Sequence, residues 1–128
     1  MKKYELLVRR LQNIEGIEIA EYEWRTRPNG DHGTVQKDFE IDSDNGNDGK
    51  QERAWEGSVD TFTNGKAMLT IAAVESVLEE ICTGSWYLNS EQYERETGLI
   101  HREFVFQLVD EDIADPDESG AAADGTDD

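Results

Sequence analysis

The chain has 128 residues, and its 12 Lys and Arg face 30 Asp and Glu, so the formal net charge is -18. Residues 110–128 hold nine of these acids and no Lys or Arg. A chain of this length is one domain at most, and an acidic surface cannot neutralise the phosphates on which nonspecific nucleic-acid affinity depends. We therefore expect no specific nucleic-acid binding and no docking on an anionic membrane.

The first forty residues predict a helix, two strands and a long turn. Residues 17–24 alternate apolar and acidic side chains, as a half-buried strand does. The run 27–33 contains Pro-Asn-Gly and predicts a turn, and 34–41 alternates again as a second strand. Four apolar residues of the N-terminal helix recur at helical spacing and form its buried stripe: Tyr4, Leu7, Val8 and Leu11.

The middle of the chain predicts a long hairpin and the main helix. Strands 34–41 and 51–62 flank the turn formers of 42–50, so the hairpin spans 34–62. On its first arm, Val35, Lys37, Phe39 and Ile41 are expected on one face. A helix capped by Asn64 follows and ends at Thr83-Gly84.

The C-terminal part predicts two strands, 85–88 and 99–109, joined by the polar segment 89–98. Large apolar residues almost vanish after Val109, so we expect a disordered acidic tail over 110–128 and one folded domain over 1–109. The predicted fold is α+β in two layers. A mainly antiparallel sheet carries both helices on one face, in the order α-β-β-β-α-β-β.

The residues that carry chemistry are few. Cys82, the single cysteine, lies on the inner stripe of a helix and is expected to be structural. The acidic run 42–49 departs from a calcium loop at the positions that need Gly and Glu. His32 and His101 belong to different elements and lack metal-ligand spacing. No nucleophile or phosphate-binding motif occurs, so we expect no cofactor and no enzymatic activity.

Aromatic and basic residues form the candidate protein interface. A sheet with helices on one side turns its other face to water or to a partner, and aromatic side chains there are typical anchors. The alternative is that these aromatic residues form a satellite core. The candidate interface residues are Trp24, Arg25, Arg27, Arg53, Trp55, Trp86, Tyr93, Arg95 and Arg102.

Three stretches carry a family resemblance: WEGSVDTFT, TNGKAMLTIAAVESVLEEI and WYLNSEQYERETGLIHREFVFQL. Together with the order of elements, they make the chain similar to the tail terminator, or tail-completion, proteins of long-tailed bacteriophages and prophages. The resemblance covers residues 1–109. The acidic hairpin tip and the acidic tail have no counterpart in it.

The resemblance implies a structural virion assembly protein. Such proteins form a ring, commonly a hexamer, on the head-proximal end of the tail tube and supply the head-tail joining surface. The implied partners are further copies of the chain, a tail tube protein and a head connector protein. The implied location is the host cytoplasm during assembly and then the virion tail. A charge of -18 should keep free subunits monomeric in dilute solution.

Two other functions stay open. An acidic protein-binding module, such as an inhibitor or a DNA mimic, would occupy a basic cleft of its partner. A small metal-dependent enzyme would use His32, His101 and nearby carboxylates. The acidity is also compatible with a salt-loving host, in which case it reflects composition alone.

Overall fold

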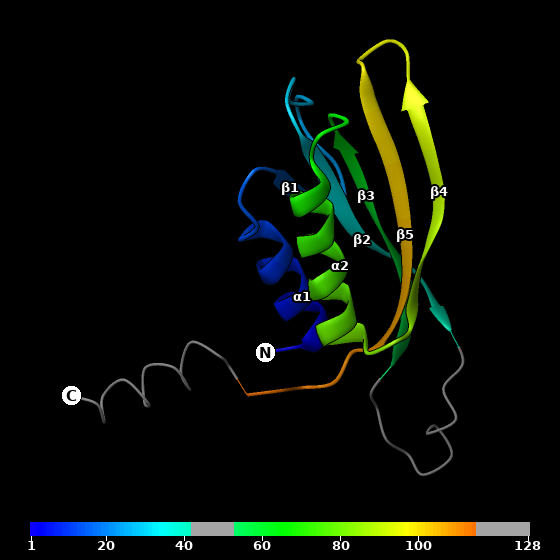
Figure 1. The fold of residues 1–128 in the computed structure, drawn as a ribbon. Coiled ribbons are helices and arrows are strands. Elements are labelled where there is room, and N and C mark those ends of the chain that lie inside the picture. The colour runs from blue at the N-terminus through cyan, green and yellow to red at the C-terminus, as the bar shows by residue number, and fades with distance from the viewer. Residues whose placement is uncertain (42–52, 115–128) are drawn as a thin grey trace, which may run out of the picture.

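The computed structural model describes residues 1–41 and 53–114, which form two helices and one sheet (Figure 1). The fold is α+β in the predicted order α-β-β-β-α-β-β, with a mostly antiparallel sheet. The expected hairpin tip at 42–50 and the chain from 115 onward lie outside the described residues. The elements are α1 (Lys3–Gln12), β1 (Glu18–Glu21), β2 (His32–Ile41), β3 (Ala54–Thr63), α2 (Met68–Cys82), β4 (Trp86–Glu94) and β5 (Leu99–Val109).

The five strands lie in the order β1-β2-β3-β5-β4. β1 runs parallel to β2, and every other neighbouring pair is antiparallel. A parallel pair needs a return connection, and here that connection is residues 22–31. Tyr22 begins it with a φ of 72°, a left-handed conformation that turns the chain sharply out of β1.

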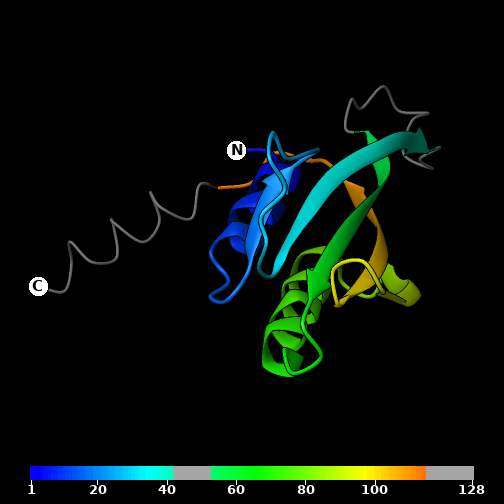
Figure 2. The same ribbon diagram turned by 90° about the horizontal axis from the view of Figure 1, so that it is seen from above.

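Both helices cover one face of the twisted sheet, and the main core lies between them and the strands (Figures 1 and 2). The predicted stripe of α1 is confirmed, since Tyr4, Leu7, Val8 and Leu11 are all buried. Phe104 and Phe106 of β5 are fully buried beneath the helices. Within residues 1–41 and 53–114, no helix lies on the other face of the sheet.

Register shifts change which side chains share a face. The pairing of β2 with β3 slips between Lys37 and Phe39, which is a bulge. Because side chains alternate between the two faces with a period of two, one extra residue moves every later side chain of the strand to the face opposite the expected one. The expectation that Phe39 and Ile41 share a face with Lys37 is therefore wrong, and Phe39 is 52% exposed.

Several expected boundaries also move. The first strand, expected over 17–24, is β1 at Glu18–Glu21, and β2 begins at His32 instead of residue 34. β4 continues from the expected 85–88 to Glu94 and contains a second bulge between Leu88 and Ser90. α2 begins at Met68, four residues after Asn64. The Asn64 side chain instead accepts the backbone N–H of Lys66 at 2.7 Å, which forms a turn before the helix.

The folded body extends past the expected limit at residue 109. The backbone N–H of Ile113 donates to the carbonyl of Met1, and Lys2 forms a bridge with Asp112. Asp110 is buried and accepts the backbone N–H of Tyr4 at 2.8 Å. The first acidic residues of the expected tail thus hold the start of α1 in place.

Within residues 1–41 and 53–114, neither helix is both long enough and apolar enough to cross a bilayer.

Candidate functional site

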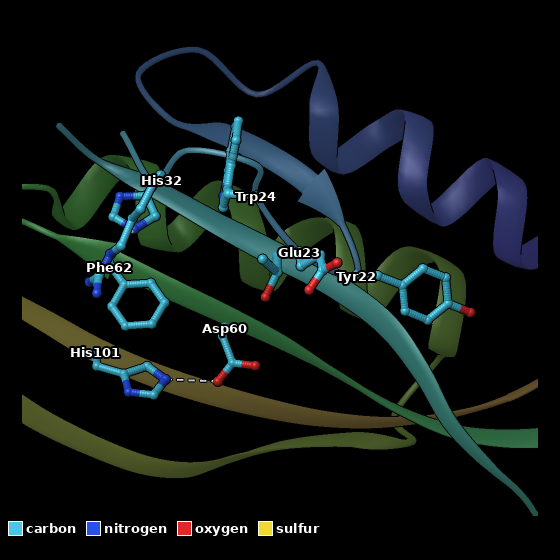
Figure 3. A pocket seen from close by; sticks show the side chains of 9 residues that line it. Tyr22, Glu23, Trp24, His32, Asp60, Phe62 and His101 are labelled. Atoms are coloured by element: carbon cyan, nitrogen blue, oxygen red, sulfur yellow. Dashed lines mark hydrogen bonds and ion pairs between the residues drawn. The ribbon is translucent and has the colours of Figure 1, made fainter. Parts of the chain in front are cut away.

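A groove of about 410 Å³ opens on the face of the sheet that carries no helix (Figure 3). Its floor comes from β2, β3 and β5, and its wall is the return segment 22–31. The residues that line it are Tyr22, Glu23, Trp24, Arg27, His32, Thr34, Asp60, Phe62 and His101.

A row of three rings crosses the groove floor. His32 pairs with Phe62 in the register of β2 and β3, and Phe62 pairs with His101 in that of β3 and β5. Paired residues point to the same face, so the rings meet. The Phe62 ring stacks on His32 with centroids 5.0 Å apart and on His101 with centroids 4.2 Å apart.

His32 is buried and both of its ring nitrogens are engaged. Its Nδ1 lies 2.7 Å from the carbonyl of Gly30, so Nδ1 carries the proton and donates it. Its Nε2 accepts a hydrogen bond of 2.8 Å from Nε of Arg27. His32 is therefore neutral in this arrangement, and the residue as a whole is 1% exposed. Neither nitrogen is available to a ligand.

Arg27 holds the groove wall against the sheet. Its guanidinium lies 4.4 Å from the centroid of the Phe62 ring, a cation–π contact. A second nitrogen of the same group pairs with Glu94 at 2.9 Å. The return segment is thus bound to the end of β4 as well as to β2 and β3. The indole of Trp24 adds a hydrogen bond of 3.0 Å to the carbonyl of Gly33.

Asp60 and His101 form a polar pair on the groove floor. Nε2 of His101 donates to Oδ1 of Asp60 at 2.7 Å. Burial raises the pKa of the Asp60 carboxyl, and the contact with His101 offsets only part of that shift. Oδ2 of Asp60 accepts no hydrogen bond from the described residues. The groove floor therefore holds a carboxylate whose negative charge is incompletely compensated.

A second carboxylate stands on the groove wall. Glu23 is exposed, and its side chain makes no hydrogen bond or ion pair with residues 1–41 or 53–114. In Figure 3 the Glu23 and Asp60 carboxylates lie on the same side of the row of rings. The groove thus combines aromatic surfaces with acceptors that lack donors.

The described part of the chain offers no set of ligands for the metal ion of the metal-dependent enzyme considered above. No group of three or more His, Cys, Asp or Glu side chains there is arranged to hold an ion. The Phe62 ring separates His32 from His101, and the lone pair of His32 is already occupied by Arg27.

The candidate interface residues fall into three groups. Trp24 and Arg27 line the groove. Arg25, Tyr93 and Arg95 are exposed elsewhere, and Arg53 pairs with Glu40 near the far end of the sheet. The remaining three lie on the helix-covered side or in internal contacts: Trp55, Trp86 and Arg102.

Each of these last three side chains makes a contact within the fold. Trp55 packs its ring 4.6 Å from the ammonium of Lys37. Trp86 donates its indole N–H to Glu79 of α2. Arg102 is buried between Glu91 and Thr63, to which it donates at 2.7 and 3.2 Å. These side chains stabilise the fold.

Sequence reasoning missed most of the groove floor. In the sequence, Asp60 and Phe62 look like ordinary strand residues. The two histidines are 69 positions apart and lack the spacing of a metal-binding motif. The available signal was the hairpin itself, because an antiparallel register with His32 opposite Phe62 brings them together. That register could not be derived while the bulge and the turn length were unknown.

No model of a known protein family matches the chain. A search of curated proteins likewise finds no match.

Proposed function

We propose that this protein is a ring-forming structural subunit that caps the head-proximal end of a phage tail tube and offers the surface for head-tail joining. The proposal starts from the order of elements, which agrees with that of the family the sequence resembles. The observation that supports it most is that the outer edge of β4 is exposed and suited to contact with another subunit.

β4 is a nine-residue strand at the edge of the sheet, and among the described strands it pairs with β5 alone. Edge strands leave backbone N–H and C=O groups open to another chain, and natural proteins often protect them with Lys or Pro. β4 contains neither residue, and its one protective irregularity is the bulge between Leu88 and Ser90. It presents three large exposed side chains, Tyr87, Leu88 and Tyr93. Such an edge is suited to contact with another subunit.

The opposite edge of the sheet differs in length and chemistry. β1 has four residues, and two of them are glutamates. A contact that joins the β4 edge to a different surface of the next copy is heterologous, and heterologous contacts close into rings when the rotation permits. The charge of -18 opposes association of free chains, so the tube end would have to template the ring.

The test uses tail tubes assembled from the tube protein of the same virus. Negative-stain images should show the full-length protein as a ring on one end of each tube, and tubes mixed with it should stop growing. Leu88→Lys and Tyr93→Lys should abolish capping, because each puts a charge on the proposed contact. Leu69→Lys is the matched control, since Leu69 is 88% exposed on α2, away from the β4 edge.

Two results would contradict the proposal. The wild-type protein would fail to bind tube ends, or all three lysine variants would cap tubes equally well. A one-to-one complex with a basic protein that dissolves in salt would instead favour the inhibitor or DNA-mimic function.

A further inference from the structure

The groove on the helix-free face has an unbalanced set of hydrogen-bonding groups. Among the described residues, the groove's carboxylate oxygens without a donor are those of Glu23 and Oδ2 of Asp60, and the Tyr22 and Thr34 hydroxyls, which can donate or accept, also have no partner. Its strongest donor, Arg27, is already committed to His32 and Glu94. A ligand that engages both carboxylates must therefore bring donors and positive charge.

The charges of the groove support the same conclusion. Glu94 compensates Arg27 at 2.9 Å, and His32 is neutral. The surplus charge is that of Glu23, together with the part of Asp60 that His101 does not offset. Burial of Asp60 makes this surplus costly in the free protein, and an incoming cation would relieve that cost.

The aromatic walls distinguish among cations. Trp24 presents an aromatic ring to the groove, whereas the Phe62 ring is stacked between His32 and His101 and the Tyr22 ring points away from the other lining side chains (Figure 3). A guanidinium is planar, stacks on such rings and carries several N–H donors in a fixed fork, whereas an ammonium is a compact, strongly hydrated charge. The protein itself supplies a precedent, because the Arg27 guanidinium already lies 4.4 Å from the Phe62 centroid in the same groove.

We propose that this groove binds an arginine side chain of a partner protein. The guanidinium stacks on the half-buried ring of Trp24 and donates to Glu23 and to Oδ2 of Asp60. The partner is a protein other than a free second copy, since free copies repel each other with a charge of -18 each and associate only where the tube end templates them. The proposal goes beyond the ring and does not depend on it, because β4 and the groove are separate surfaces.

The test is an NMR titration of the full-length isotope-labelled chain with N-acetylarginine amide in 0.15 M salt. Saturable shifts should appear at the Trp24 indole N–H and around Phe62 and His101. N-acetylcitrulline amide has nearly the same shape without the charge and should cause no saturable shift. N-acetyllysine amide should bind more weakly than the arginine probe.

Variants locate the site. Glu23→Gln and Asp60→Asn should each weaken binding about tenfold, the scale of one charge-assisted hydrogen bond. Glu56→Gln is the control, because Glu56 lies on the same strand and face as Asp60 but outside the groove, where it accepts from Gln107. It should bind the probe as the wild type does.

Several outcomes would overturn the assignment. The assignment fails if the citrulline probe binds as well as the arginine probe, if the shifts scatter over the acidic surface, or if Glu56→Gln weakens binding as much as Glu23→Gln. Shifts of the groove resonances that grow with protein concentration, without probe, would assign the arginine to a second copy and refute a distinct partner. The free chain is used throughout, so failure here is distinct from failure of tube capping.

Discussion

Asp110 accepts a hydrogen bond of 2.8 Å from the backbone N–H of Tyr4, although 106 residues separate them in the chain. Lys2, at the N-cap position of α1, makes no side-chain capping bond. Asp110 takes over that role from the far end of the chain, where a negative charge also complements the helix dipole. The same carboxylate lies 3.5 Å from the ammonium of Lys37, which is sandwiched between the rings of Tyr4 and Trp55.

The first prediction concerns this cap. Asp110→Ala should lower the free energy of unfolding by about 2–4 kcal/mol, because it removes a helix cap and leaves Lys37 largely buried without a counter-charge. Asp112→Ala is the control, since Asp112 is exposed and its contact with Lys2 spans 3.6 Å. It should change stability by less than about 0.5 kcal/mol. Urea denaturation measures both, and equal effects would contradict the capping role.

A second prediction concerns Gly57, which lies under the ring of Phe106. A Cβ at this position would be 2.3 Å from the carbonyl oxygen of Gln36 and 2.4 Å from Cζ of Phe106. Phe106 is fully buried and the Gln36 carbonyl belongs to the backbone of β2, so neither can move away cheaply, and Gly57→Ala should destabilise the fold by about 1–3 kcal/mol.

Gly30→Ala provides the comparison, because a Cβ at Gly30 would have no atom within 4 Å. Its unfolding midpoint should stay within error of the wild type. A wild-type midpoint for Gly57→Ala as well would show that the strands separate easily at this point.

A third prediction separates the groove from the fold. Burial raises the folded-state pKa of Asp60, so this group stabilises the fold below its unfolded pKa, near 3.8, and that contribution is lost as pH rises through the folded pKa. At pH 7 the carboxylate is therefore a net cost. Asp60→Asn should be at least as stable as the wild type at pH 7, while it binds the arginine probe less well.

The measurement is the difference in unfolding free energy between Asp60→Asn and wild type as a function of pH. It should move in favour of the variant as pH rises from about 3.8, where the unfolded carboxyl ionises, through the raised folded-state pKa. A variant that instead loses stability over this range would mean that the contact with His101 outweighs burial, and Asp60 would then be a structural residue.

The fourth prediction concerns alkaline pH. Burial raises the pKa of the Cys82 thiol from an ordinary value of 9.0 to about 12. The neutral thiol is thus favoured in the fold, and its contribution to stability is intact below pH 9 and lost between pH 9 and 12. Over that interval the free energy of unfolding should fall by up to about 1.4 kcal/mol per pH unit for this group.

Cys82→Ala should remove that slope and add only a cavity cost that does not depend on pH. The burial of Tyr4 raises its pKa too, so part of the alkaline dependence should persist in the variant. A thiol reagent at pH 8 should label wild-type Cys82 far more slowly than the unfolded chain. Rapid labelling of the native protein would show that the end of α2 opens readily.

The two helices and the order of the elements along the chain could be predicted because their signals are local. The stripe of Tyr4, Leu7, Val8 and Leu11 repeats within three turns, and Thr83-Gly84 marks the end of α2 within two residues. Such patterns depend only on the periodicity of a single helix or strand, which can be recognised from the residues of that element alone. The sequence therefore sufficed for the fold class.

The groove depended on tertiary contacts. His32, Phe62 and His101 meet because three strands pair in one register, and the bulge between Lys37 and Phe39 changes which side chains point to each face. The Asp110 cap likewise joins two residues that are 106 positions apart in the chain. The spacing of residues along the chain does not predict such contacts, because they depend on long-range strand pairing and on the conformations of the connecting segments. Only the packed structure determines both.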